Sequence, residues 1–120
     1  MGSWKSRTNL DPEKQIEDHL TKRVEKELGG VCWKFTSPGN KGVPDRIVIL
    51  NDMLCFVELK RPVGGRLSPM QKWRIKQLLK NGQQAYAIKN TDMVDELVDH
   101  LMKGVYPDAI QAAQISGVFD

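Results

Sequence analysis

The chain has 120 residues, 40% hydrophobic and 28% charged, which predicts one small folded domain and excludes a disordered chain. We expect an intracellular protein without a membrane span or signal peptide, and its two cysteines, Cys32 and Cys55, as core residues without metal-ligand spacing. The net charge of +3 is uneven, because residues 91–120 hold one Lys or Arg against six Asp or Glu. The basic remainder favours a polyanionic partner such as nucleic acid, although solvated surface lysines would give the same count.

The first elements are a helix and a strand. Residues 1–10 are expected to be a flexible N-terminal segment, and Asp11 is positioned to cap a helix that ends at Gly29 and Gly30. The apolar positions of this helix recur at helical spacing: Ile16, Leu20, Val24 and Leu28. After it, alternation over residues 31–35 predicts a half-buried strand with Trp33 in the core, before a loop over residues 37–42.

Two further strands form a hairpin whose turn determines their register. Residues 46–50 and 53–59 are apolar runs separated by Asn-Asp, a pair that tolerates the positive φ of a two-residue turn. This turn places Asp45 opposite Glu58, on the face that also carries Lys60. Both faces are otherwise largely apolar, so we expect central strands covered by helices on both sides.

The remaining segments complete an α/β domain over residues 11–104. A capping box at residues 68–71 begins a helix that ends near Lys80, and residues 85–88 form a strand parallel to 53–59. Thr91 begins a last helix whose acids are expected to form a solvated outer face. The predicted order is helix-strand-strand-strand-helix-strand-helix, with a four-stranded mixed sheet. Residues 105–120 are a C-terminal tail, either disordered or docked on a partner subunit.

The charged residues at the end of the apolar face form a candidate hydrolytic site. Opposed cross-strand residues have Cβ atoms about 5 Å apart, so two carboxylates there repel unless a cation neutralises them. Mg²⁺ or Mn²⁺ prefers oxygen ligands such as Asp45 and Glu58, and the carbonyl of Leu59 could add another. Lys60 can orient a water that attacks phosphorus. The structural alternative is that Lys60 only pairs with Glu58 while Asp45 stabilises a turn.

Three segments carry a family resemblance: Gly42-Val43-Pro44-Asp45-Arg46, Phe56-Val57-Glu58-Leu59-Lys60-Arg61-Pro62 and Leu67-Ser68-Pro69-Met70-Gln71. They resemble the VRR-NUC (virus-type replication-repair nuclease) family of the PD-(D/E)xK nuclease superfamily. The resemblance implies a restriction-endonuclease-like core and a Mg²⁺- or Mn²⁺-dependent endonuclease. It also implies that Asp45 and Glu58 are metal ligands, Lys60 the catalytic lysine and Gln71 an auxiliary residue, with one further acid on the first helix. Stand-alone members of the family look like homodimers that act on branched DNA, including four-way (Holliday) junctions, in bacterial or phage DNA repair.

Two of these roles have structural alternatives. Gln71 is the third residue of the capping box, yet it shares a helical stripe with Ile75 that points toward the sheet, so both roles stay open. For the acid on the first helix, Glu17 aligns with Leu20 at the edge of the buried stripe, whereas the helix dipole explains Glu13. We therefore predict Glu17.

The surroundings of the site suggest how DNA would be held. Basic residues near it are expected to contact phosphates: Lys41, Arg61, Arg66 and Lys72. Trp33 and Trp73 are expected in the core rather than as base-stacking platforms, and His19 in a surface or packing role. The predicted function is a metal-dependent, structure-specific DNA endonuclease. The alternatives are a non-catalytic basic nucleic-acid-binding module and a broad, structure-blind nuclease.

Overall fold

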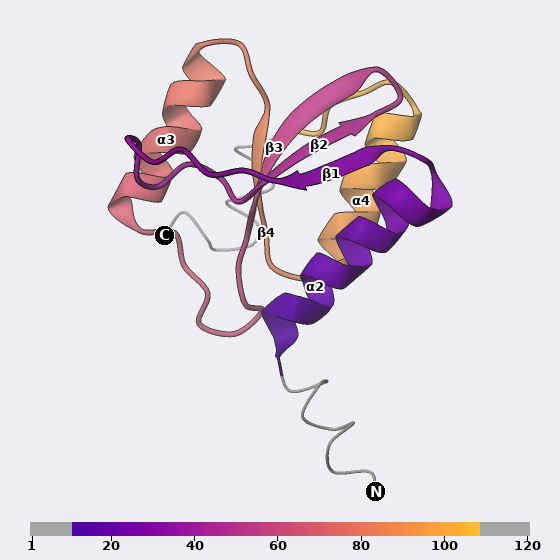
Figure 1. The fold of residues 1–120 in the computed structure, drawn as a ribbon, viewed down its shortest axis with the longest axis horizontal. Helices are drawn as coiled ribbons and strands as arrows, with labels where there is room; N and C mark the ends of the chain where they lie inside the picture. The colour runs from indigo at the N-terminus through magenta and orange to yellow at the C-terminus, as the bar shows by residue number, and fades with distance from the viewer. Residues whose placement is uncertain (1–10, 109–120) are drawn as a thin grey trace, which may run out of the picture.

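A mixed four-stranded sheet of order β1-β2-β3-β4 lies at the centre of the computed structural model, which describes residues 11–108 (Figure 1). The elements are α2 (Pro12–Thr21), η1 (Lys22–Glu27), β1 (Val31–Lys34), β2 (Arg46–Leu50), β3 (Met53–Leu59), α3 (Pro69–Lys80), β4 (Ala85–Ile88) and α4 (Thr91–Met102). The strand pairs β1-β2 and β2-β3 are antiparallel, and β3-β4 is parallel. The predicted element order and fold class are thus confirmed. The expected N-terminal segment and residues 109–120 of the expected tail lie outside the described residues.

The first helix begins as predicted but ends differently. The Asp11 side chain accepts a hydrogen bond from the backbone N–H of Lys14 at 3.0 Å, and Pro12 occupies the first turn. Its last part, η1, is π-helical, where the sequence predicted continuous α-helix. Ile16, Leu20 and Val24 nevertheless all stay buried. None of the helices in residues 11–108 is long and apolar enough to cross a membrane.

The hairpin turn has the predicted geometry. Asn51 and Asp52 have φ values of 55° and 61°, which give the tight turn that matches the twist of the flanking strands. The resulting register pairs Leu50 with Met53 and Ile47 with Phe56, as predicted. Asn51 also donates a side-chain hydrogen bond to the carbonyl of Leu101 at 3.0 Å, which joins the turn to α4.

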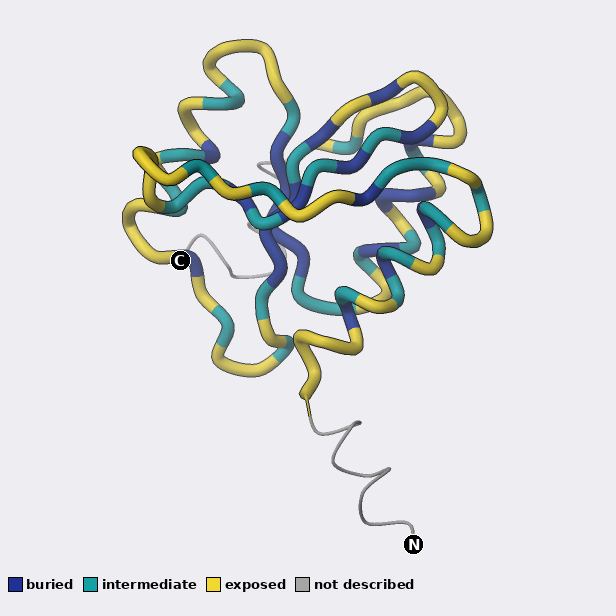
Figure 2. The backbone as a smooth tube through the Cα atoms, in the orientation of Figure 1, coloured by how far each residue is buried: buried dark blue, intermediate teal, exposed yellow. Residues whose placement is uncertain are grey.

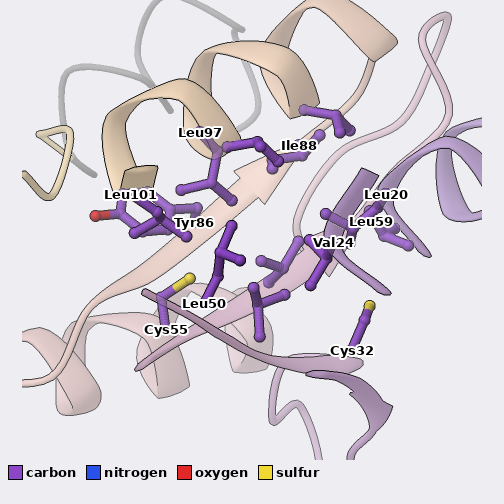
Figure 3. Packing of buried hydrophobic residues seen from close by; sticks show 14 of the residues in the cluster. Leu20, Val24, Cys32, Leu50, Cys55, Leu59, Tyr86, Ile88, Leu97 and Leu101 are labelled. Carbon is purple, nitrogen blue, oxygen red and sulfur yellow. The ribbon is translucent and has the colours of Figure 1, made fainter. Parts of the chain in front are cut away.

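The two faces of the sheet are covered unequally. Figure 3 shows Leu20, Val24, Leu59, Ile88 and Leu97 in the main core, between the sheet and the helices α2 and α4. On the other face α3 covers a smaller cluster: Leu67, Ile75, Ala85 and Ala87. The prediction that both faces of the central strands are covered is therefore only half correct. Because α3 connects β3 to β4, it packs mainly on the β4 side of this face, and Trp33 and Leu54 on the rest of the face are exposed.

Both tryptophans predicted in the core are exposed, which corrects that prediction. Trp33 is 61% exposed because its neighbour Cys32 faces the main core, so the side chain of Trp33 lies on the opposite face of the sheet. In Figure 2 the tube is coloured exposed where β1 ends and the loop to β2 begins. Trp73 is 52% exposed on α3, where the guanidinium of Arg74 stacks 4.7 Å from its ring centroid. Both cysteines are buried and free, as predicted.

Three of the four acids of α4 are exposed, as predicted, and Asp95 is half-buried beside α2 and η1. Asp95 accepts from Arg23 at 2.7 Å and contacts His19 at 2.7 Å, and Asp99 lies 3.5 Å from the same arginine. The hydrogen bond from His19, followed by that from Arg23, lowers the pKa of Asp95. These pairs form because α2 and η1 pack beside α4, a neighbourhood that single-helix periodicity does not reveal.

The first residues of the predicted tail contact their own domain. The hydroxyl of Tyr106 accepts a hydrogen bond from the backbone N–H of Leu54 at 3.0 Å. The hydroxyl of Tyr86 donates to the carbonyl of Pro107 at 2.8 Å. Residues 105–108 are thus held against β3 and β4 by side chains of the same chain.

Candidate active site

Asp45 and Glu58 meet where β2 begins and β3 ends. Asp45 lies one residue before the Arg46–Val57 pair that ends the ladder, and its backbone carbonyl accepts from Phe35 N–H at 2.7 Å. Its carboxylate accepts a hydrogen bond from the backbone N–H of Leu59 at 3.1 Å, which directs it across to β3. The two carboxyl groups are therefore adjacent at the end of the same sheet face. The third predicted ligand is the carbonyl of Leu59, the same residue whose backbone N–H donates to Asp45.

Glu58 is a buried acid with one unsatisfied oxygen. Its residue is 3% exposed, and its Oε2 lies 3.1 Å from Gln71 Nε2 and 3.7 Å from Lys60 Nζ. Its other oxygen, Oε1, is buried without a hydrogen-bond partner in the described part of the chain. Burial, followed by the nearby charge of Asp45, raises the pKa of Glu58 to about 8, although the charge of Lys60 acts in the opposite direction.

Gln71 has both of its predicted structural contacts, the capping box and a contact with the carboxyl pair. Its Oε1 accepts from the backbone N–H of Ser68 at 2.8 Å, and the Ser68 hydroxyl accepts from Gln71 N–H at 3.1 Å, which completes the capping box. Its Nε2 donates to Glu58 at 3.1 Å. A single amide thus begins α3 and fixes the buried carboxyl.

The residues predicted to contact phosphates lie on two loops and on α3. Lys41, Arg61 and Arg66 are exposed on the loops before Asp45 and after Lys60, whereas Lys72 is half-buried on α3. The loop of residues 61–66 folds back tightly, because a Cβ on Gly65 would lie 2.3 Å from the carbonyl oxygen of Arg61. This loop directly follows Lys60 in the chain, and its role in phosphate binding stays a prediction.

Glu17 lies apart from the carboxyl pair. Its carboxylate forms an ion pair with Arg46 at 2.7 Å and another with Lys14 at 3.0 Å, and the bond to Arg46 lowers its pKa. It faces a charged hollow of about 770 Å³ between α2, η1 and Cys32. Glu13, one turn earlier, contributes to the raised pKa of Glu58. Glu17 is thus held by Arg46, and the choice between Glu13 and Glu17 as the helix acid stays a prediction.

Arg46 is a buried basic residue whose ion-pair partner, Glu17, is not predictable from the sequence pattern. It is 8% exposed, pairs with Glu17 and donates to the carbonyl of Cys32 at 3.4 Å. The available signal was its position on the core-facing side of β2, where a charged side chain requires a partner. Since Arg46 directly follows Asp45, its ion pair anchors the start of β2 to α2.

Comparisons with known proteins agree with this geometry. No family model matches the chain. Over 82 residues the chain is 42% identical to the protein named "Putative nuclease p44" of Acyrthosiphon pisum secondary endosymbiont phage 1, covering 68% of this chain and 86% of that protein. A solved structure described as a VRR_NUC domain superposes with a TM-score of 0.68 at 28% identity, covering 74% of this chain and 96% of its own. The chain belongs to the VRR-NUC family.

This VRR-NUC nuclease carries a donor set that fits a divalent cation. Within residues 11–108, no group of three or more His, Cys, Asp or Glu side chains could hold a metal, so the site depends on the two carboxyls of Asp45 and Glu58. Mg²⁺ is usually bound by one or two carboxylates together with water and substrate phosphate. A cation would also give the unpartnered Oε1 of Glu58 a partner. Its charge would offset the effects of burial and of the Asp45 charge, which raise the pKa of Glu58. The residues present therefore fit Mg²⁺ or Mn²⁺.

Proposed function

We propose that this VRR-NUC nuclease is a Mg²⁺- or Mn²⁺-dependent endonuclease that hydrolyses phosphodiester bonds in DNA. The observation that carries the proposal is the buried, half-satisfied carboxyl of Glu58 between Asp45 and Lys60. The Lys60 ammonium, 3.7 Å from Oε2, leaves Oε1 without a partner, and burial together with the charge of Asp45 outweighs it and raises the pKa of Glu58. This favours a cation-binding role over the structural alternative.

Each residue of the site has a distinct proposed task. Asp45 and Glu58 would hold the cation together with the Leu59 carbonyl, and the bound cation would polarise the phosphate and acidify a water. The ammonium group of Lys60 would orient the attacking water and stabilise charge on phosphorus-bound oxygens. Gln71 holds Glu58 in place, and we assign the helix acid to Glu13. The basic residues named above would bind phosphates and so position the strand.

The preferred substrate is proposed to be branched DNA, such as a four-way junction, in bacterial or phage-infected cells. Two pieces of support are the VRR-NUC family membership and the phage origin of the relative. We assign residues 11–104 as the nuclease domain. A two-fold symmetric pair of such domains could address two strands of a symmetric junction.

The part of the sheet face that α3 leaves exposed is our proposed dimer surface. Trp33 is 61% exposed and Leu54 is 37% exposed there, beside the half-buried Ile47 and Ile49. Exposed apolar patches of this kind mark interaction sites. We therefore expect native protein to have the mass of two chains in light scattering and Trp33→Ser that of one chain. Trp73→Ser, a matched exposed tryptophan on α3, should leave the native mass unchanged, and a native protein of one-chain mass would contradict the dimer.

A cleavage assay with metal replacement tests the function itself. Labelled four-way, flap and linear DNA are incubated with Mg²⁺, Mn²⁺ or EDTA, using native protein and Lys60→Ala. We expect cutting of branched DNA with either metal, none in EDTA, and a loss of roughly 10²-fold or more with Lys60→Ala, because a charge-stabilising donor is removed. Lys80→Ala, an exposed lysine at the far end of α3, is the matched control and should cut normally.

The remaining outcomes separate the alternatives. Cutting that persists in EDTA and in Lys60→Ala would overturn the metal mechanism. Tight binding without any cutting would support the non-catalytic module, and equal cutting of all three DNA forms would support the structure-blind nuclease.

A further inference from the structure

A small cavity lies beside the candidate active site, between the β1-β2 loop, β3 and α3. Its volume is about 270 Å³. Two aromatic rings, Phe35 and Phe56, lie 5.7 Å apart between their centroids. The rest of the lining consists of two aliphatic, three uncharged polar and one basic side chain: Val43, Leu78, Ser37, Asn40, Gln77 and Arg74. The cavity is thus apolar on its walls and able to form hydrogen bonds at its edge.

The cavity is close to the carboxyl pair along the strands. Phe56 lies two residues before Glu58 on β3, and Val43, another lining residue, lies two residues before Asp45. Phe56 and Glu58, two apart on β3, point to the same face and are separated by about 7 Å, whereas Val43 lies in the loop that leads to Asp45. In B-form DNA this distance corresponds to about two nucleotides of one strand, which rise about 3.4 Å each. A strand whose phosphate lies at the carboxyl pair therefore carries bases within reach of the cavity.

The walls of the cavity are held in place without a ligand. Arg74 on α3 donates from Nε to the carbonyl of Lys41 at 2.9 Å, and Asn40 donates to the Ser37 hydroxyl at 2.9 Å. Gly42 has φ of +87° and packs so closely on α3 that a Cβ would lie 2.7 Å from Met70 Cγ. In Figure 1 the β1-β2 loop runs beside α3, as these contacts require. The cavity is therefore a preformed feature, which lowers the cost of binding.

We infer that this cavity receives an unpaired nucleobase of the bound DNA. A base has a π-face that stacks on aromatic rings and an edge of donors and acceptors that matches amides and hydroxyls. The volume is below the roughly 300–1,000 Å³ of pockets for drug-sized ligands, which suits a single ring system. Arg74, which also lines the cavity, adds positive charge for the attached phosphates. The inference rests on the proposed function, because it requires DNA at the carboxyl pair.

The test measures the affinity for DNA when single bases are removed from the DNA and when single side chains of the cavity are changed. In a Lys60→Ala background, which prevents cutting, branched DNA is titrated with one nucleotide at a time made abasic around each cleavage site. We expect one position at which base removal weakens binding roughly tenfold, the usual contribution of a stacked base. In Phe35→Leu, the same base removal should cost less than about twofold, because the variant has already lost the stacking partner and the two changes are coupled.

Gln77→Ala provides an independent version of the test. Gln77 is exposed on α3 and lines the cavity, so its truncation should reduce the penalty without unfolding the protein, which circular dichroism checks. Gln83→Ala, an exposed glutamine just after α3 and outside the cavity lining, should keep the full penalty.

Two results would overturn the inference while leaving the nuclease proposal intact. One is a loss of affinity on base removal that is equally large in the parent protein and in both cavity variants. The other is firm binding of the branched DNA with no position at which base removal matters, which would leave the cavity to a protein side chain or to water. A native protein that neither binds nor cuts DNA would instead remove the proposed function, and the inference with it.

Discussion

Glu58→Gln is expected to have two opposite effects, a large loss of cleavage and a gain in stability of the metal-free protein at pH 8. The loss of activity should be roughly 10²-fold or more, because the neutral amide is a poorer ligand for a hard divalent cation. The gain in stability follows from the burial of the acid, which is 3% exposed and carries an unpartnered oxygen. An amide of the same shape removes the buried ionisable group.

The pH dependence gives this prediction its sign. The pKa of Glu58 is about 8 in the folded chain, against an ordinary value of 4.5. Between these pH values the folded state keeps a proton that the unfolded state has released, so the free energy of unfolding falls as pH rises through this window. Above pH 8 Glu58 is ionised in both states, so it no longer makes the free energy of unfolding depend on pH. The amide introduced by Glu58→Gln has no proton to lose, so the variant should lack this contribution and exceed the native protein by roughly a few kcal/mol at pH 8.

Urea unfolding in EDTA at pH 5, 6.5 and 8 measures the effect. Added Mg²⁺ should stabilise native protein at pH 8 but not Glu58→Gln, because the cation binds the ionised acid. Glu96→Gln, an exposed glutamate on α4, is the matched control for the loss of one carboxyl group. If Glu58→Gln and native protein showed the same pH slope, the buried acid would not be titrating in this window.

Glu17→Ala is expected to lower the free energy of unfolding by about 2–3 kcal/mol, somewhat less than for a fully buried ion pair. The reason is that Arg46, 8% exposed, would lose its 2.7 Å partner and retain a buried charge. Replacing that charge as well, in Glu17→Ala with Arg46→Met, should recover part of the loss. Urea unfolding measures both variants, and a double variant less stable than the single one would contradict this account.

The same helix provides the comparison that separates stability from catalysis. Glu17→Gln should cut DNA at near the native rate per folded molecule, whereas Glu13→Gln, one turn away, should lose roughly tenfold, as expected for a group that acts through a metal ligand. The reverse pattern would restore Glu17 as the helix acid. Rates are measured well below the unfolding temperature so that the loss of the ion pair does not affect them.

Local sequence signals predicted most of the fold because each depends on neighbouring residues. The Asn51-Asp52 turn determines the β2-β3 register, and that register brings Asp45 beside Glu58 without any knowledge of the rest of the chain. The capping box similarly located the start of α3 and one role of Gln71. The residues of the candidate site could therefore be predicted where a local signal, the turn or the capping box, determines their position.

The errors concern contacts between distant segments. Strand alternation separates Cys32 from Trp33 but does not determine which of them faces a helix, so the expectation of a buried Trp33 is wrong. The stripe of the first helix placed Glu17 at a buried edge correctly, yet its partner Arg46 comes from another element. Partner choice depends on how the helices pack on the sheet, which periodicity within one element does not specify.

The two roles of the Gln71 amide explain why glutamine, rather than glutamate, stands at this position. Either residue completes a capping box, and a glutamate would also interact favourably with the positive end of the α3 dipole. Here, however, the second end of the amide donates to Glu58 at 3.1 Å, and a carboxylate would place a third negative group against an acid that Asp45 already disfavours in its ionised form. The electrostatics of the carboxyl pair thus restrict a choice that helix stability alone would leave open.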